Sequence, residues 1–99
     1  MMTKREAIDG LRRHADAIKA LGVTSLYLFG STLRGEARST SDLDLFVEYD
    51  AVGKFSLIEL VAVKQLLEAR LGHPVDVTTR DSLHPVLREE IERTAERVF

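Results

Sequence analysis

The chain of 99 residues contains no cysteine, which excludes disulfides and thiolate metal sites. It also lacks an excess of basic residues, and a formal net charge of -2 argues against a dedicated nucleic-acid-binding protein. No apolar run approaches the roughly 20 residues of a membrane-spanning helix. The first residues, MMTKRE, lack the apolar core of a signal peptide. We therefore expect a cytoplasmic protein with no membrane partner and no direct nucleic-acid partner.

Two common kinds of site are also missing from the sequence. The chain has no Gly-Lys-Ser/Thr sequence of a Walker phosphate loop. Its three histidines, His14, His73 and His84, are scattered without metal-ligand spacing, so we expect surface or capping roles for them. His84 precedes Pro85 and is the one expected nearest the active end of the sheet. Any metal site must therefore use carboxylates.

The length predicts a single domain over residues 1–99. A chain of this size buries roughly 60–70% of its unfolded surface, which is enough for one core. Hydrophobic periodicity predicts helices over residues 3–21 and 57–71 and strands over residues 23–29, 42–49 and 75–79. A last helix is expected after a cap at Ser82 or His84, and residues 98–99 either form a short strand or pack. This order predicts an α/β (α+β) fold with a small mixed sheet of three to four strands flanked by helices.

Three apolar faces are expected to form the core. The strand over residues 42–49 alternates, which predicts one buried face made of Leu43, Leu45 and Val47. The inward residues of the second helix are expected to be Leu57, Leu60, Val61, Leu67 and Leu71. In the last helix the expected apolar stripe is Leu87, Ile91 and Ala95, and its charged residues are read as a solvated face.

Asp42 and Asp44 stand two residues apart in the second strand, so both project from the face opposite Leu43. The helix between the second and third strands predicts a parallel, right-handed crossover. Asp76 then lies at the same end of the sheet and on the same face. Three carboxylates on one patch repel one another unless a cation is present. We predict that Asp42, Asp44 and Asp76 bind Mg²⁺, which takes carboxylate and phosphate oxygens.

The alternative interpretation is that these acidic residues are merely solvated at strand ends, and for Asp76 it stays open. An EF-hand is excluded, because apolar residues replace the polar ligands and the glycine of that loop. Ten residues before the aspartates, Gly30 and Ser31 follow the first strand.

Exposed backbone N–H groups and a hydroxyl at such a turn suit a phosphate. Arg34 and Arg38 are expected to add charge-assisted hydrogen bonds, although Arg34 could equally anchor the turn. Ser41 is expected to brace Asp42, and Gly35 to supply a positive φ angle. A Gly-Ser pair alone is a weak signal and gains force only from the Asp-Leu-Asp that follows.

The stretch GSTLRGEARSTSDLDLFV at residues 30–47 resembles the motif of the minimal nucleotidyltransferases of the DNA polymerase β superfamily. In particular it resembles the MntA-like antitoxins that are paired with HEPN-domain toxins. The resemblance covers nearly the whole chain, including Asp76 and the start of the last helix. It implies that Gly30 and Ser31 contact the nucleotide triphosphate, that Asp42 and Asp44 bind two magnesium ions, and that Asp76 completes the site and helps to activate the acceptor hydroxyl.

The implied reaction is transfer of AMP from Mg-ATP to a tyrosine of a cognate HEPN RNase toxin, which silences the toxin. The second domain of larger relatives is missing, so the acceptor platform is expected on a partner protein. Two alternatives stay open. The chain could be a non-catalytic antitoxin that neutralises its partner by direct binding, or a subunit of a small-molecule nucleotidyltransferase.

Overall fold

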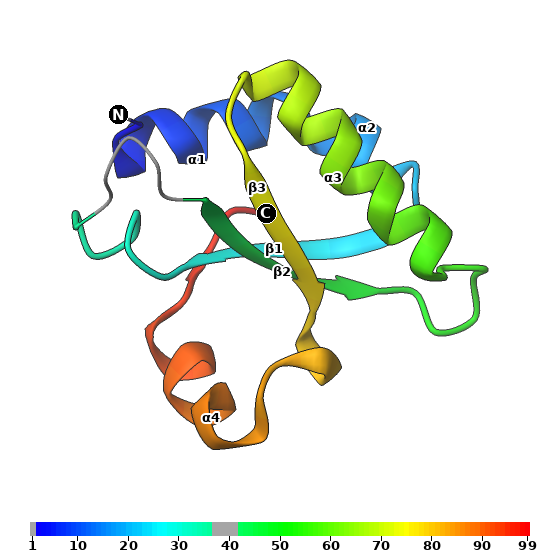
Figure 1. The fold of residues 1–99 in the computed structure, drawn as a ribbon. Helices are drawn as coiled ribbons and strands as arrows, with labels where there is room; N and C mark the ends of the chain where they lie inside the picture. Colours follow the sequence, from blue (N-terminus) through cyan, green and yellow to red (C-terminus); the bar gives the residue numbers. More distant parts are fainter. Residues whose placement is uncertain (1, 37–41) are drawn as a thin grey trace.

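Four strands form one mixed sheet in the order β3-β2-β1-β4 (Figure 1). The structure is a computed structural model that describes residues 2–36 and 42–99. β1 (Val23–Phe29) is antiparallel to β2 (Leu43–Tyr49) and to the short β4 (Glu96–Arg97), whereas β3 (Val75–Thr79) is parallel to β2. The predicted strands and the mixed α/β (α+β) sheet are confirmed, with β2 beginning one residue later than expected.

The parallel pair β2 and β3 is connected by α3 (Leu57–Leu71), as the crossover rule requires. Ser56 caps this helix, and its Oγ accepts a hydrogen bond from the N–H of Ile58. Gly72 ends it in a left-handed conformation. Both boundaries follow local rules, which is why the sequence predicts them.

The single helix expected over residues 3–21 is wrong. The structure has α1 (Lys4–Arg13), which begins at the predicted capping box of Thr3, and a separate α2 (Ala15–Lys19). At the junction the N–H of His14 bonds to the carbonyl of Leu11, one residue short of a helical partner. No glycine or proline stands at this break, so the helical period alone does not reveal it.

The helices α1, α2 and α3 cover one face of the sheet and form the main core with it (Figure 1). The expected inward face of α3 is partly wrong, because Leu57 is 73% exposed and Val61 is 44% exposed. The buried residues of α3 are Val63 and Leu67. Apolar side chains occur on nearly every side of this helix, so periodicity does not select the buried one.

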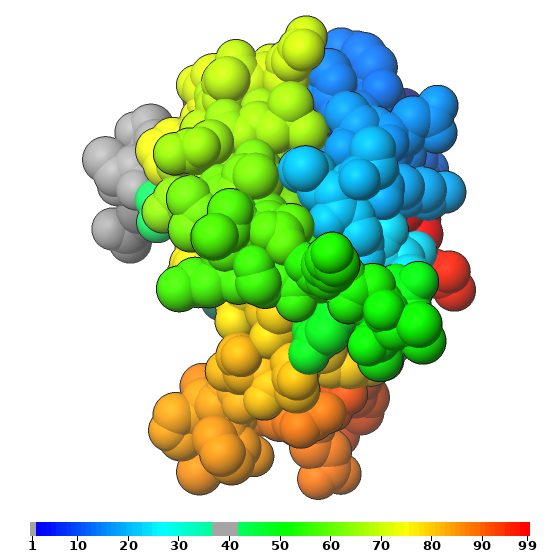
Figure 2. Space-filling model, turned by 90° about the vertical axis from the view of Figure 1, so that its right-hand side faces the viewer, coloured from blue at the N-terminus to red at the C-terminus, as the bar shows by residue number. Residues whose placement is uncertain are grey.

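The last helix, α4 (Pro85–Thr94), lies on the opposite side of the sheet and projects below the other helices (Figures 1 and 2). His84 caps it, and its Nδ1 accepts from the N–H of Val86 at 3.2 Å. The expected stripe of Leu87, Ile91 and Ala95 does not enter the core, since no residue of α4 is buried. Sequence periodicity marks an apolar face but not what covers it.

The second face of the sheet is not simply solvated either. Phe46 of β2 is completely buried there, although β2 was expected to bury one face only. Its ring stacks on Tyr27 with the centroids 4.6 Å apart, and the ring of Phe29 lies 5.8 Å away. Among the helices of residues 2–36 and 42–99, none is long and apolar enough to cross a membrane.

Candidate active site

Asp44 occupies the second position of β2, between the buried Leu43 and Leu45. Its side chain therefore projects from the face opposite the main core. In the parallel ladder it stands directly beside Asp76 of β3, and in the antiparallel ladder beside Phe29 of β1. The predicted register of Asp44 and Asp76 is confirmed. It places two carboxylates side by side where β2 and β3 begin and β1 ends.

The electrostatics of Asp44 show which charges surround it. Partial burial raises the pKa of Asp44 above its ordinary value, and the negative charges of Asp76 and Asp42 raise it further. The charge of Arg34 acts in the opposite direction. Asp42 lies just before β2 and is exposed, as is Asp76. The three predicted carboxylates and one arginine thus act on a common point, and Asp44 is the most enclosed of them.

Gly30 allows the backbone to approach Asp44 closely. Its φ angle is +82°, a left-handed conformation that side chains other than glycine rarely adopt. A Cβ atom placed on Gly30 would lie only 3.1 Å from the Cβ of Asp44 and would also meet the carboxylate. The missing side chain of Gly30 therefore makes room for the carboxylate of Asp44.

Residues 31–35 form a hydrogen-bonded turn after Gly30, where the sequence predicts a short helical turn. The carbonyls of Gly30 and Ser31 accept from the N–H groups of Arg34 and Glu36, at 3.2 and 2.8 Å. Within the described part of the chain, the N–H groups of Ser31, Thr32 and Leu33 have no hydrogen-bond partner. Such N–H groups at the start of a helical turn attract anions.

The sequence left open whether Arg34 anchors the turn or binds phosphate; the structure shows the first of these contacts, and the second stays a prediction. Its Nε donates to Glu36 within the turn, at 3.0 Å, and its charge also reaches Asp44. Arg38 and Ser41, which were expected to contact phosphate and to brace Asp42, lie outside the described residues. His84 serves as a helix cap, in agreement with its expected role.

The carboxylates suit a hard divalent cation in their chemistry. Asp42, Asp44 and Asp76 offer oxygen ligands, and the pKa of Asp44 is raised first by its partial burial and then by the charges of the other two. Among residues 2–36 and 42–99, however, no three acidic or histidine side chains are close enough to form a complete metal cage. A partial set of this kind fits Mg²⁺, which is usually held by one or two carboxylates together with waters and substrate phosphates.

A groove of about 250 Å³ adjoins this cluster, and sequence reasoning missed it. One side consists of Phe29, Gly30 and Arg34, and the other is a face of α4 made of Leu87, Glu90, Ile91 and Thr94. The signal in the sequence was the spacing of those four residues, which places them on one helical face. Without the position of α4, the same spacing predicts an apolar stripe in the core and a charged face in solvent.

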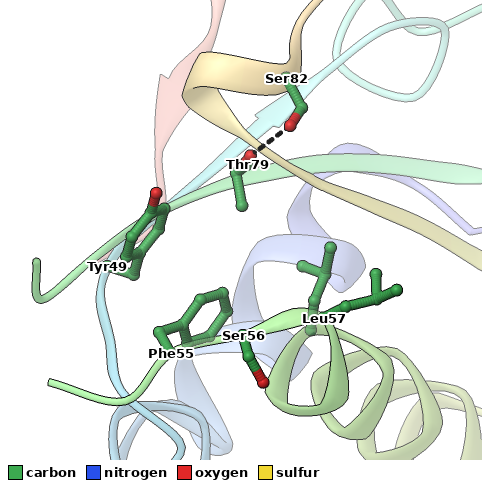
Figure 3. A pocket seen from close by; sticks show the side chains of 7 residues that line it. Tyr49, Phe55, Ser56, Leu57, Thr79 and Ser82 are labelled. Atoms are coloured by element: carbon green, nitrogen blue, oxygen red, sulfur yellow. Dashed lines mark hydrogen bonds between the residues drawn. The ribbon is translucent and has the colours of Figure 1, made fainter.

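A second pocket lies at the opposite end of the sheet, where β2 and β3 finish (Figure 3). Tyr49 and Phe55 form one wall, with their rings stacked 4.9 Å apart. Thr79 and Ser82 line another side of the pocket, where the hydroxyl of Thr79 donates a hydrogen bond to that of Ser82 at 2.7 Å. None of the aspartates of the cluster lines this pocket. The predicted site residues therefore lie at the other end of the sheet, which holds Asp44.

The chain is similar to known proteins over nearly its whole length. Residues 11–98 match the family described as the nucleotidyltransferase domain. A candidate protein adenylyltransferase of Methanocaldococcus jannaschii is 43% identical over 88 residues, which are 89% of this chain and 85% of that protein. Protein adenylyltransferase MntA of Thermococcus cleftensis is 34% identical over 97 residues, which are 92% of this chain and 96% of that protein.

Solved structures show the same fold. A candidate minimal nucleotidyltransferase superposes with a TM-score of 0.72 at 35% identity, over 90% of this chain and 93% of that one. The MNT antitoxin complex with a tri-AMPylated HEPN toxin of Shewanella oneidensis gives a TM-score of 0.65 at 18% identity, over 93% of this chain and 71% of that one. A toxin–antitoxin structure with AMP-PNP gives a TM-score of 0.68 at 22% identity, over 99% of this chain and 73% of that one. The last two similarities concern the fold alone.

Proposed function

This chain belongs to the nucleotidyltransferase domain family, and from that membership we propose that it transfers AMP from Mg-ATP to a protein hydroxyl. The proposed acceptor is a tyrosine of a HEPN RNase toxin, for which the chain acts as the antitoxin. The names of the relatives support the reaction, and the antitoxin complexes of the same fold support the partner. The observation that carries the proposal is Asp44, which stands beside Asp76 and packs over Gly30.

We assign the roles of the site as follows. Asp42 and Asp44 hold two magnesium ions, and Asp76 completes the ligand set. The N–H groups that follow Gly30, with the hydroxyl of Ser31, bind the triphosphate, and Arg34 adds a positive charge beside it. Bound magnesium neutralises phosphate charge and lowers the pKa of the acceptor hydroxyl.

In the proposed step the acceptor oxygen bonds to the α-phosphorus of ATP. The bond from that phosphorus to the bridging oxygen breaks, and pyrophosphate leaves. The proton of the hydroxyl passes to a carboxylate, for which Asp76 is the best placed because it is exposed beside Asp44.

The test is the intact mass of a HEPN-domain toxin co-expressed with this chain, after incubation with ATP and magnesium. We expect wild type to add one or more AMP groups to it. Asp44→Asn should transfer at least about 100-fold less, because even residues that only support metal ligands cost 10–100-fold when they are replaced. Asp9→Asn is the matched control, since Asp9 is exposed on α1, which covers the face of the sheet opposite Asp44.

Three results would contradict the proposal. Equal transfer by wild type and Asp44→Asn would remove the aspartates from the chemistry. Protection of cells from the toxin by an Asp42→Asn, Asp44→Asn double variant, to the same degree as wild type, would show that direct binding is sufficient. Transfer to a small molecule but never to the HEPN protein would identify a different acceptor.

A further inference from the structure

The groove between Gly30 and α4, called here the Gly30–α4 groove, begins inside the candidate active site. Gly30 and Arg34 line the groove and also belong to the proposed phosphate site. A nucleotide whose phosphates lie at the turn after Gly30 therefore has this groove immediately beside it. Its volume of about 250 Å³ is below the roughly 300–1,000 Å³ of complete ligand pockets, so it accommodates part of a nucleotide.

The far wall of the groove is a helical face that the fold does not use for its own core. Leu87, Glu90, Ile91 and Thr94 follow the spacing of one face of α4. No residue of α4 is buried, and Leu87 remains 51% exposed. The helix is attached to the sheet through the ion pair of Glu92 with Arg80 instead. The groove face thus remains available to a ligand.

The chemistry of this wall suits a nucleobase. Leu87 and Ile91 offer aliphatic surface for a flat ring, and Phe29 lies on the side of the sheet. Two oxygen acceptors accompany them. Among the described residues the carboxylate of Glu90 has no hydrogen-bond or ion-pair partner, and Thr94 donates its hydroxyl proton to the carbonyl of Glu90 at 2.8 Å. A wall of acceptors recognises a group that donates.

We propose that the Gly30–α4 groove receives the base of the nucleotide, and that Glu90 accepts a hydrogen bond from an exocyclic amino group of that base. This inference rests on the proposed nucleotide transfer and specifies which nucleotides enter. Adenine carries such an amino group and uracil does not. UTP offers no such donor and forms one hydrogen bond fewer with the exposed carboxylate of Glu90, so the groove favours ATP over UTP.

The test compares Glu90→Ala with Glu89→Ala in the transfer of nucleotide to the HEPN protein. Both changes remove one exposed acidic residue from α4, but only Glu90 lines the groove. We expect Glu90→Ala to raise the KM for ATP about three- to tenfold, the effect of one hydrogen bond, with little change in kcat. The KM for UTP should stay constant or fall, so the ratio of the KM for UTP to the KM for ATP becomes smaller. Glu89→Ala should leave both values unchanged.

Inorganic tripolyphosphate supplies a second readout, because it carries the phosphates without a base. Its inhibition constant should be the same for wild type and Glu90→Ala. An equal rise in KM for ATP and UTP, or weaker inhibition by tripolyphosphate, would show that Glu90 acts on the phosphates or on the fold. A rise in the KM of the HEPN protein alone would assign the groove to the acceptor. Absence of transfer by wild type with every nucleotide would instead refute the proposed function.

Discussion

At the scale of single residues, the site depends on the fit between Gly30 and Asp44. Gly30 has a positive φ angle and leaves space for the carboxylate, whereas Gly35 has a positive φ angle and no atom of residues 2–36 or 42–99 lies within 4 Å of where its Cβ would be. A side chain at Gly30 would therefore meet both backbone strain and a steric clash, whereas one at Gly35 would meet backbone strain alone. Gly30 serves both needs, and Gly35 serves only the first.

This difference predicts different outcomes for the two alanine variants. Gly30→Ala and Gly35→Ala should each lose about 1–2 kcal/mol of unfolding free energy, the cost of a left-handed conformation for a residue with a Cβ atom. Only Gly30→Ala should also lose nucleotide transfer, because its Cβ displaces Asp44. Urea denaturation and the transfer assay measure the two effects. Retained activity in Gly30→Ala, or an equal loss in Gly35→Ala, would contradict the assigned contact.

At the scale of secondary-structure elements, Arg80 fastens α4 to the sheet. It follows β3 in the 3-10 turn η1 (Arg80–Ser82). Its Nη1 lies 3.0 Å from Glu48 of β2, and its Nε lies 2.6 Å from Glu92 of α4. The guanidinium also stands over the rings of Tyr27 and Phe46, at 5.4 and 5.5 Å from their centroids. The contact of Arg80 Nε with Glu92 is an ion pair, but its geometry is not that of a hydrogen bond.

Arg80→Met is therefore expected to lower the free energy of unfolding by about 1–3 kcal/mol. The value lies between the cost of an exposed pair, about 0–1 kcal/mol, and that of removing one partner from a buried pair, about 3–5 kcal/mol, because the Arg80 side chain is 31% exposed. Arg80→Lys should retain only part of this stabilisation, since an ammonium group does not span two carboxylates as a guanidinium does.

Urea denaturation measures this change, and Arg88→Met is the control. Arg88 pairs with the same Glu92 but is 42% exposed, and no aromatic ring of the described residues lies beneath its guanidinium. A loss in Arg88→Met as large as that in Arg80→Met would show that Arg80 has no special role in holding α4.

The elements differ in how far the sequence predicts them. The strands, the crossover and the caps at Thr3, Ser56 and His84 follow local rules, and the structure confirms them. The break at His14 has no local marker, and the apolar residues of α3 surround the helix. Their positions depend on packing partners distant in the sequence, which periodicity does not identify.

At the scale of the whole molecule, the acidic site opposes folding stability. The pKa of Asp44 is raised in the folded protein by partial burial and by Asp76 and Asp42. The folded state then binds a proton more tightly than the unfolded chain does. The tighter proton binding of Asp44 stabilises the folded state fully at a pH below its ordinary pKa of 3.8. This stabilisation is lost as the pH rises through the higher pKa that Asp44 has in the folded protein. At neutral pH, ionised Asp44 without a cation is unfavourable.

We therefore expect Asp44→Asn to melt a few degrees higher than wild type at pH 7 in EDTA. The gain should stay small, because solvent screening keeps the interactions of a half-buried charge below about 1 kcal/mol. The difference in melting temperature should shrink toward pH 4, and magnesium should raise the melting temperature of wild type more than that of the variant. Thermal melts followed by circular dichroism measure both. A lower melting temperature for Asp44→Asn throughout would contradict the crowding of charge.

The pairing of Asp44 with Asp76 could be predicted from residue order alone, because alternation along a strand and the handedness of a crossover are properties of the backbone. The contact of Gly30 with Asp44 and the groove along α4 could not. Each of these joins segments that no local rule relates, and each depends on how densely side chains pack once the sheet has formed. The chemistry of the site is thus written in short motifs, whereas the wall beside it is a consequence of where α4 comes to lie.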